Sequence, residues 1–583
     1  MSHSPGLFRL IFFFTTVTAL TFTCLSVGHA SHTDPVVGTV YFTPKNSRIY
    51  FEDYDFTLRG YNLDGVTYFF LPSFIQDLRL DYSSSGPELF REDGELYIIP
   101  AAEKVESVLV GQPTVGGGDA SCKIVFFFSE NLYTMDIELE DTNLRFVTRN
   151  DYSTASVKLI SPSGVTDCCI KQALIKGRGN TTWDHEKRPY DIKFPWNIPV
   201  AGLWPCDSWS LLANHYDPTK MRHRLAFDIA DAIGLEDVTG SEWIDLYIDG
   251  DYRGNYLVCN EPEGLPGGYL IEANATPKGR GDRFSFEIPS GVSMTLNSPA
   301  FPTKDDKEYI TTVTDDLDDA IHNDLPEAQY RVLDRYSFAR MFLVDEISLN
   351  ADIDFSSHFY YTEPKNSRMY AGPLWDYDKA FGYSRHGMRD WNNSILSSSG
   401  ERLDWQDKLM EDKEYYDYAA SVFSQNEPAL EKIVNKNIDD YYRKINASTK
   451  MDRIRWTKRL DDNMYKDTYN DIRYLKFFLS NRLSYLSGKY SADAKIMPAD
   501  VSTKETHELT LNMPDGSVRK MDVTDGTLLT QDDLPPLTGS DIWCFDFYGK
   551  HEIADGFIPV FEDATLTAGT PVSEKPDRPL PKR

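Results

Sequence analysis

Residues 176–194 read KGRGNTTWDHEKRPYDIKF, a glycine loop followed by a segment with the alternation of a strand. Two glycines flank the arginine of the turn at 177–179. Because glycine has no side chain, the backbone there can come close to an anion, and Arg178 adds a forked pair of donors. The stretch therefore predicts an anion-binding loop next to a strand.

The strand expected at 190–194 carries apolar side chains on one face and charged side chains on the other. Asp191 and Lys193 share the charged face. A lysine fixed on a rigid strand beside a glycine loop is how a kinase holds nucleotide phosphates. The same residues also fit a simpler structure, a glycine turn before an edge strand with solvated charges.

Residues 375–382 read WDYDKAFG and bring two carboxylates, Asp376 and Asp378, into an aromatic setting. Carboxylates at positions i and i+2 can share a metal ion, directly or through water. Mg²⁺ takes one or two carboxylates together with phosphate oxygens and water molecules. The alternative is a pair of aspartates that cap a turn.

Residues 346–354, EISLNADID, end an amphipathic helix expected at 328–349. Glu346 and Asn350 lie on one helix face because they are four residues apart, and Asp352 follows where the helix ends. A carboxylate there could orient a substrate hydroxyl and accept its proton. Acids at a helix C-terminus are unfavourable unless a positive charge compensates them, and a metal ion or a nearby arginine would do so.

These parts follow one another along the chain in the order in which they occur in a kinase. The standard protein-kinase signatures GxGxxG, HRD and DFG are missing. The collinear set nevertheless resembles the CotH (spore-coat protein H) kinase family. The resemblance rests on residues 178–180, 187–194, 217–222, 246–250, 252–256, Glu261, Glu346, Asn350, Asp352, 375–378, Phe381 and Gly382.

The resemblance implies an atypical protein-kinase-like, two-lobe domain over residues 155–495 that uses ATP and Mg²⁺ or Mn²⁺ to phosphorylate proteins. It assigns the catalytic role to Asp352, and Asp354 fits the same stretch, so the choice between them stays open. Lys193 is similar to the phosphate-binding lysine of the family. The residues that the resemblance assigns to cofactor binding are Arg178, Lys187, Lys193 and Glu261, and those that it assigns to the metal are Asp376, Asp378 and Asn350.

The chain has 583 residues, and its formal net charge of −30 limits the classes of partner. A chain of this length normally forms more than one domain, and a hydrophobic content of 41% is ample for folded structure. The negative charge repels nucleic-acid phosphates and anionic lipid, so neither is expected as a partner. The charge suits basic protein tails, although solubility outside the cell is the simpler explanation.

Residues 1–30 have the features of an export signal, with Arg9, an apolar run from Leu10 to Val27 and a small residue, Ala30, at the cleavage position. An uncleaved anchor is the alternative, but the apolar run is short for a membrane span. No second apolar stretch approaches that length. We therefore expect a secreted or cell-surface protein with no stable membrane span after cleavage.

Its cysteines lack zinc-ligand spacing and are expected as buried thiols or as disulfides.

Inside the central domain, the sequence predicts a β-rich part followed by an α-rich part. Asp217 and Pro218 suit the first positions of a helix that ends at Gly234. Two strands at 243–248 and 255–258 follow, and the pattern from 402 to about 490 is helical.

Short β-type segments flank the central domain on both sides, so the expected fold class is an α+β multidomain protein. Residues 31–150 predict a β-sandwich-like domain. Residues 505–568 predict a small β-rich domain that resembles the Listeria–Bacteroides repeat of surface proteins, and 569–583 form a Pro-rich disordered tail.

Two functions are compatible with these patterns. The first is an ATP-dependent protein kinase that acts on exported or surface proteins. The second is a surface-binding or adhesive protein with a catalytically degenerate kinase fold. A structural coat component whose kinase domain acts only during assembly is a third, weaker alternative.

Overall fold

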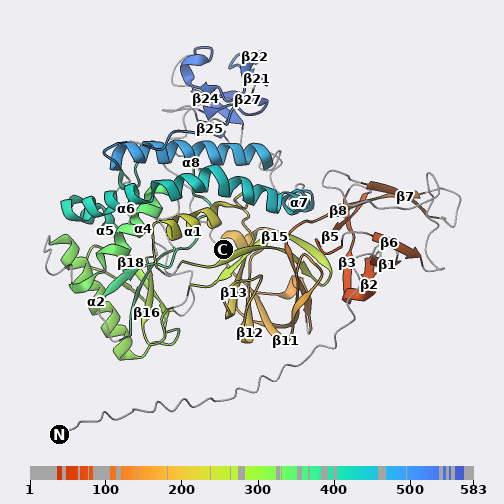
Figure 1. The fold of residues 1–583 in the computed structure, drawn as a ribbon, viewed down its shortest axis with the longest axis horizontal. Helices are drawn as coiled ribbons and strands as arrows, with labels where there is room; N and C mark the ends of the chain where they lie inside the picture. The colour runs from red at the N-terminus through yellow and green to blue at the C-terminus, as the bar shows by residue number, and fades with distance from the viewer. Residues whose placement is uncertain are drawn as a thin grey trace, which may run out of the picture.

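The computed structural model describes most of the chain between Val36 and Gly569 (Figure 1). Residues 1–35, which hold the expected export signal, lie outside the described residues. The described residues are 36–41, 48–63, 66–75, 78–82, 106–112, 120–140, 142–179, 181–236, 238–262, 264–273, 283–323, 329, 331–350, 357–364, 368–382, 391–397, 403–456, 468–493, 495–499, 501–503, 505–537, 542–546, 550–552 and 558–569.

The N-terminal part forms two four-stranded sheets, with the orders β3-β2-β1-β6 and β4-β5-β8-β7. Their strands are β1 (Val36–Tyr41), β2 (Arg48–Phe51), β3 (Phe56–Arg59), β4 (Tyr61–Leu63), β5 (Val66–Leu71), β6 (Leu78–Tyr82), β7 (Glu106–Gln112) and β8 (Ala120–Phe128). The expected β structure is thus present here. Both sheets contain a parallel pair, β1 with β6 and β5 with β8.

A closed barrel follows, with the strand order β10-β11-β12-β13-β15-β14-β9. Its strands are β9 (Tyr133–Leu139), β10 (Ser153–Ile160), β11 (Thr166–Gly177), β12 (Tyr190–Ile198), β13 (Cys206–Leu212), β14 (Ser241–Ile248) and β15 (Asp251–Asn260). The apolar face predicted for 190–194 is confirmed, because Tyr190, Ile192 and Phe194 are buried in the barrel core. The boundary expected at residue 150 falls inside this barrel, since β9 pairs with β10.

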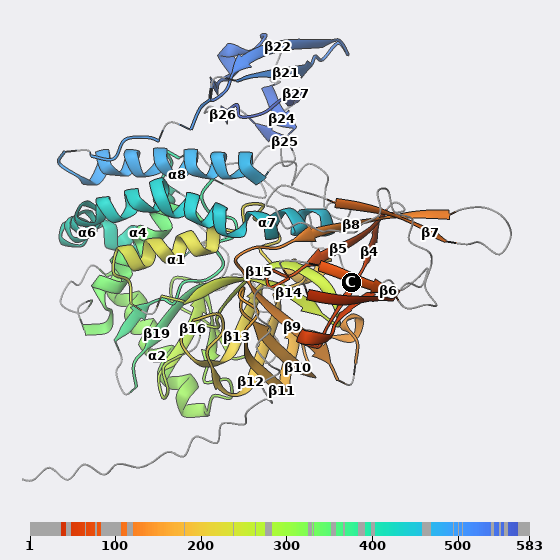
Figure 2. The same cartoon turned by 45° about the vertical axis from the view of Figure 1, so that its right-hand side comes forward.

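The two N-terminal sheets pack against the β14–β15 side of the barrel (Figure 2). The ring of Phe56 meets that of Tyr247 edge to face at 5.2 Å. The Tyr247 hydroxyl donates to the backbone oxygen of Phe70 at 2.9 Å. The aromatic residues of the N-terminal part therefore form a second hydrophobic cluster with Tyr247 and Tyr252, separate from the core inside the barrel.

The α-rich part covers one side of the barrel and a second, five-stranded sheet of order β17-β18-β16-β19-β20 (Figure 1). The strands are β16 (Tyr269–Ala273), β17 (Ser285–Glu287), β18 (Ser293–Ser298), β19 (His358–Thr362) and β20 (Met369–Ala371). The helices are α1 (Arg222–Ala232), α2 (Lys304–His322), α4 (Arg335–Ser348), α5 (Trp405–Glu411), α6 (Lys413–Lys432), α7 (Ile438–Trp456) and α8 (Thr468–Tyr490). The order predicted from periodicity, a β-rich part followed by an α-rich part, is confirmed.

Helix α1 begins later than the sequence pattern predicts. Asp217 does not cap it. Instead, its carboxylate accepts from the backbone N–H of Thr219 at 2.9 Å and that of Arg222 at 2.8 Å. Lys220 has φ of 61°, which a right-handed helix does not permit. Asp217 therefore closes a turn in front of α1 and fixes the backbone up to Arg222.

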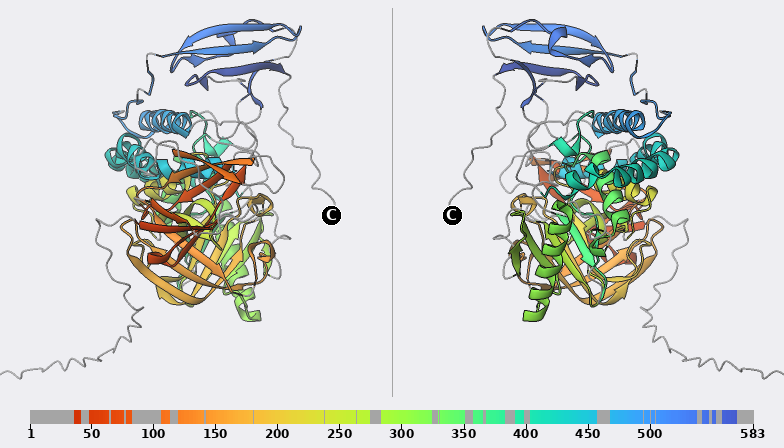
Figure 3. Two further views of the ribbon diagram at one scale, coloured as in Figure 1. Left: turned by 90° about the vertical axis from the view of Figure 1, so that its right-hand side faces the viewer. Right: turned by 90° about the vertical axis from the view of Figure 1, so that its left-hand side faces the viewer.

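The C-terminal part is a separate small β module above α8 (Figure 3). Its strands are β21 (Thr506–Asn512), β22 (Val518–Thr524), β23 (Leu528–Leu529), β24 (Ile542–Asp546), β25 (Lys550–Glu552), β26 (Ile558–Pro559) and β27 (Ala564–Gly569). Arg473 of α8 joins the module to the helices. Its guanidinium pairs with Asp525, lies 4.2 Å from the centroid of the Phe561 ring and donates to the Val501 oxygen at 2.8 Å.

Replacing Asp525 with asparagine is expected to loosen this module without unfolding the rest. The change removes the charge that compensates Arg473, and an unpaired buried hydrogen-bonding group costs about 1–3 kcal/mol. Limited proteolysis between residues 491 and 505 should become faster, while the main calorimetric transition stays in place. Glu508→Gln, which breaks the exposed Lys520–Glu508 pair, is the control and should leave the cleavage rate unchanged. An equal cleavage rate in Asp525→Asn and wild type would contradict the role of Arg473.

Among the described residues, no helix has both the length and the apolar character required to cross a membrane. Cys168, Cys206 and Cys259 have free thiols, as expected for buried or partly buried cysteines.

Candidate active site

Arg178 lies where the barrel meets the α-rich part. Its Nε is 2.7 Å from Oδ1 of Asp191 on β12, and its guanidinium carbon lies 4.8 Å from the ring centroid of Trp375. The absence of a side chain at Gly177 lets the ring of Trp183 pack against the backbone, because a Cβ there would overlap that ring. Gly179 has φ of 80°, which favours glycine. The glycine loop thus places Arg178 in contact with Asp191 and with Trp375, which lies almost 200 positions later in the chain.

Asp191 and Glu261 form an acidic pair beside Arg178 on the outer face of the barrel. Ser210 joins them, since its hydroxyl lies 3.0 Å from Asp191 Oδ1 and 3.3 Å from Glu261 Oε1. Burial, strengthened by the charge of Asp191, raises the pKa of Glu261 to about 7. Lys176 adds a second cation, with Nζ 3.9 Å from Asp191 Oδ2. Two cations and two acids therefore balance at this face.

The pH dependence of stability should report on Glu261. A carboxyl whose pKa is higher in the folded protein than in the unfolded chain favours folding at low pH, and this contribution is lost as the pH rises from about 4.3 towards 7. Glu261→Gln should therefore gain about 1–3 kcal/mol relative to wild type between pH 5 and pH 8. Denaturant unfolding at several pH values measures this difference. A constant difference over that range would mean that Glu261 does not titrate as proposed.

Asp376 lies in an irregular segment between β20 and Gly382, the last described residue before 391. It has φ of 65°, in the left-handed region. The Asn350 amide donates to the Asp376 backbone oxygen at 3.1 Å, and the Ser357 hydroxyl donates to Oδ2 at 3.4 Å. The Asp376 side chain is 41% exposed, whereas Asp378 is buried. Asn350 thus holds the backbone that presents the Asp376 carboxylate.

His223 is the functional candidate that the sequence analysis missed. Its Nδ1 lies 3.0 Å from Oδ1 of Asn214, and its Nε2 lies 4.0 Å from Oδ1 of Asp376. The ring is almost completely buried, and Nε2 has no hydrogen-bond partner among the described residues. Burial lowers the pKa of His223 to about 4, although Asp376 opposes the shift. The imidazole is therefore neutral at physiological pH. A single histidine after Arg222 carries no pattern, so the sequence offered no signal for it.

The turn before α1 also holds the Asp376 segment in place. Arg222 pairs with Asp217, and its Nε donates to the backbone oxygen of Ala380 at 2.9 Å. Asp217 and Arg222 belong to one of the stretches on which the family resemblance rests. Together they fix the backbone in front of α1 and at Ala380. No described contact joins either side chain to Asp376.

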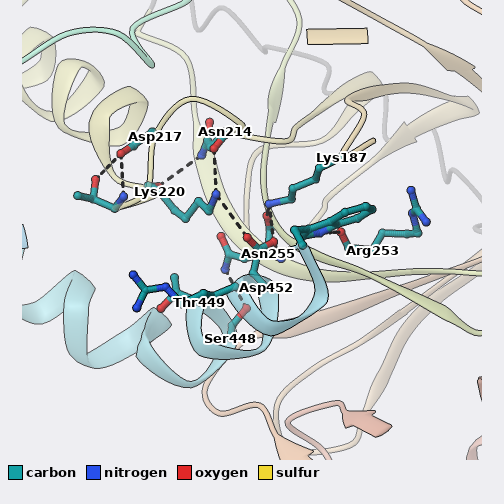
Figure 4. Close-up of polar contacts among 12 residues, drawn as sticks. Lys187, Asn214, Asp217, Lys220, Arg253, Asn255, Ser448, Thr449 and Asp452 are labelled. Carbon is teal, nitrogen blue, oxygen red and sulfur yellow. Dashed lines mark hydrogen bonds and ion pairs between the residues drawn. The ribbon is translucent and has the colours of Figure 1, made fainter. Parts of the chain in front are cut away.

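Lys187 lies in a second, buried cluster (Figure 4). Its ammonium is 2.5 Å from Asp452 Oδ1 on α7 and donates to the Asn255 oxygen at 2.7 Å. Lys220 reaches the other oxygen of Asp452 at 3.4 Å. Burial lowers the pKa of Lys187 to about 7, although Asp452 opposes the shift. The ion pair of Lys187 with Asp452 therefore links the loop before β12 to α7.

The side chain of Lys193 does not lie with Arg178. It is exposed on β12, while Asp191, two residues earlier, contacts the arginine. Asp352 and Asp354 lie outside the described residues, so the choice between them stays open. The structure brings Arg178, Asn350 and Asp376 together, with Glu261 linked through Ser210 and Asp191. The cofactor and metal roles of all these residues stay predictions.

Nearby cations compensate the negative charge of Glu346, as the simpler of the two explanations for an acid at a helix end predicts. Glu346 pairs with Arg482 at 3.3 Å and with Lys489 at 3.0 Å, both from α8. It also accepts from the backbone N–H of Ile395 at 2.8 Å. The acid at the end of α4 therefore ties two helices together.

The chain was compared with known proteins. The profile of the family described as CotH kinase protein matches residues 175–486, more than half of the chain. The chain belongs to the CotH kinase family. The match to the CotH kinase family begins near the end of β11 and ends within α8, so it contains Arg178, His223, Asn350 and Asp376. Comparison with curated proteins gave no match.

The CotH kinase family implies ATP and a divalent metal, and the residues present fit a metal. Within the described residues, no group of three or more His, Cys, Asp or Glu side chains is arranged as a metal cage. Mg²⁺ and Mn²⁺ at phosphate sites do not require one, since nucleotide oxygens and water complete the shell. The half-exposed carboxylate of Asp376 and Nε2 of His223, which no described residue hydrogen-bonds, are suitable donors.

Proposed function

We propose that this protein is an atypical, metal-dependent protein kinase that transfers phosphate from ATP to exported or surface proteins. The observation that carries the proposal is the meeting of the glycine loop with the Asp376 segment. Arg178 stacks on Trp375, the residue before Asp376, although the two segments lie almost 200 positions apart. Phosphoryl transfer requires this combination of a cation for phosphate and a carboxylate for metal in one place.

The roles follow from the surroundings of each group. Arg178 offers its guanidinium to phosphate oxygens while Asp191 and Trp375 hold its orientation. Asp376 holds the metal, and Asn350 fixes the backbone of Asp376. The divalent ion, when bound, neutralises charge on the phosphates. Asp352 is the proposed acceptor of the substrate hydroxyl proton.

The test uses purified full-length protein, labelled ATP, and Mg²⁺ or Mn²⁺ with a basic, serine-rich peptide. Asp376→Asn should lose at least about 10²-fold in rate, because it removes the metal-binding charge. Asp439→Asn is the matched control, since Asp439 is similarly exposed and pairs with Lys476 on the helical surface. Absence of both label transfer and nucleotide binding in wild type would overturn the proposal.

A surface-binding protein with a degenerate kinase fold is the second candidate function. The exposure of Lys193 favours it, since a phosphate-binding lysine normally faces the nucleotide. The two candidates differ in the effect of Asp376→Asn. If the variant retains the biological activity of the wild type, the binding function is correct.

A further inference from the structure

The buried nitrogen of His223 faces a carboxylate with no proton between them. Its Nδ1 meets Oδ1 of Asn214 at 3.0 Å, and the amide of Asn214 points to the Lys220 oxygen at 3.4 Å. Since the Asn214 oxygen can only accept, Nδ1 carries the proton of the ring. Nε2 therefore presents a lone pair to Oδ1 of Asp376, 4.0 Å away.

Two acceptors that face each other are unfavourable unless a positive charge lies between them. A buried acceptor without a partner costs about 1–3 kcal/mol. Within the part of the chain that the structure describes, Nε2 of His223 has no hydrogen-bond partner, and the ring is only 3% exposed. The usual explanation, a core histidine satisfied on both nitrogens, does not apply here. Asn214 satisfies one nitrogen and leaves the other directed at the candidate metal ligand.

The distance suits a shared ion. Bonds of about 2.0–2.1 Å to nitrogen and about 2.0–2.2 Å to oxygen, the lengths that Zn²⁺ makes, add up to about 4.2 Å, which is the widest separation that one such ion can bridge. The observed 4.0 Å lies within that limit. The Asp376 carboxylate is 41% exposed and can come closer, whereas Asn214 holds the imidazole in place. The nearby charge of Arg178 is offset by Asp191.

We infer that His223 is a metal ligand through Nε2, together with Asp376, and that the site therefore prefers Mn²⁺ to Mg²⁺. Imidazole binds transition metals, whereas Mg²⁺ prefers oxygen ligands alone. The inference rests on the proposed function, because nucleotide oxygens and water complete the shell. The hydrogen bond from His223 to Asn214 on the far side of the ring is the support that metal-binding histidines usually have.

Pulsed electron paramagnetic resonance on the full-length, metal-free protein loaded with Mn²⁺ and ADP tests this inference. Wild type should bind Mn²⁺ and show a coupling to a directly bound nitrogen, and labelling histidine with ¹⁵N should change that coupling. His223→Gln should abolish it and weaken Mn²⁺ binding about 10–100-fold, with a smaller loss for Mg²⁺ measured by competition. Asp376→Asn should weaken both metals.

The outcomes separate this inference from the proposed function. Bound Mn²⁺ without nitrogen coupling in wild type, or a coupling that persists in folded His223→Gln, overturns the inference and leaves the kinase proposal standing. No binding of Mn²⁺ or Mg²⁺ with ADP overturns both. If His223→Gln does not fold, the ¹⁵N-labelled wild type still decides whether histidine binds the metal. His185→Gln and His215→Gln then show whether either of these histidines supplies the nitrogen.

Discussion

Replacing Asp452 with asparagine is expected to destabilise the protein by about 3–5 kcal/mol. The carboxylate lies between two buried ammonium groups, Lys187 at 2.5 Å and Lys220 at 3.4 Å. Asparagine has nearly the same shape and can still accept from the Asn255 N–H, which now donates to Asp452 at 3.0 Å. The substitution therefore removes charge with little change in packing and leaves two buried lysines without their carboxylate partner.

Denaturant unfolding of Asp452→Asn and wild type at pH 7 measures this loss. The control is Asp440→Asn on the same helix, where the carboxylate pairs with Lys436 and Arg443 at the surface. Exposed pairs add little to stability, so the control should unfold at the wild-type midpoint. Equal midpoints for all three proteins would show that the buried cluster does not hold α7 against the barrel.

Gly254 explains why α7 can come so close to β15. It has φ of 114°, and a Cβ there would overlap the carboxylate of Asp452. Asn255 on the same strand donates from its side chain to Ser448 at 3.0 Å, so backbone and side chains of β15 both bind the helix. Polar contacts are therefore dense where α7 meets β15, beside the apolar packing of Met451. Loss of the charge at the centre of this interface should therefore affect the whole central domain.

Local patterns of the sequence predicted the parts of the fold that depend on local physics. The alternation at 190–194 predicted the buried face of β12, and the two strands expected at 243–248 and 255–258 lie in the β14–β15 hairpin. Where residues 402–490 are described, helices α5 to α8 confirm the predicted helical pattern. The start of α1 was wrong, because Asp217 bonds forward to Thr219 and Arg222 in a turn that resembles a helix cap in sequence.

Only those residues of the candidate site that stand in a recognisable sequence motif could be predicted. Arg178 and Asp376 stood out by their glycine and tryptophan neighbours, and the structure brings them together. The resemblance favoured Lys193 as the phosphate-binding lysine. Nothing in the local sequence indicated that Lys187 pairs with Asp452, because Asp452 lies far along the chain. Such long-range burial leaves no trace in a short sequence window. His223 is a further example, since only the fold sets it beside Asp376.

Arg178→Ala is expected to lower kcat/KM for phosphate transfer by about 10²–10³-fold. The guanidinium is oriented by Asp191 and Trp375, and alanine removes both its charge and its paired donors. Arg178→Lys should fall between wild type and alanine, because lysine keeps the charge but neither the fork nor the stacking on the ring. Steady-state kinetics with labelled ATP, together with nucleotide binding, measures these differences.

Lys193→Ala, measured in the same assay, decides which cation serves the phosphates. Its side chain is exposed on β12, so we expect a far smaller loss than for Arg178→Ala. Arg443→Ala, which removes a surface cation on α7, controls for the general loss of positive charge. A loss in Lys193→Ala as large as in Arg178→Ala would mean that β12 turns this lysine to the nucleotide during the reaction. Unchanged kinetics in Arg178→Ala would remove the arginine from the mechanism, and with it the contact on which the proposed site depends.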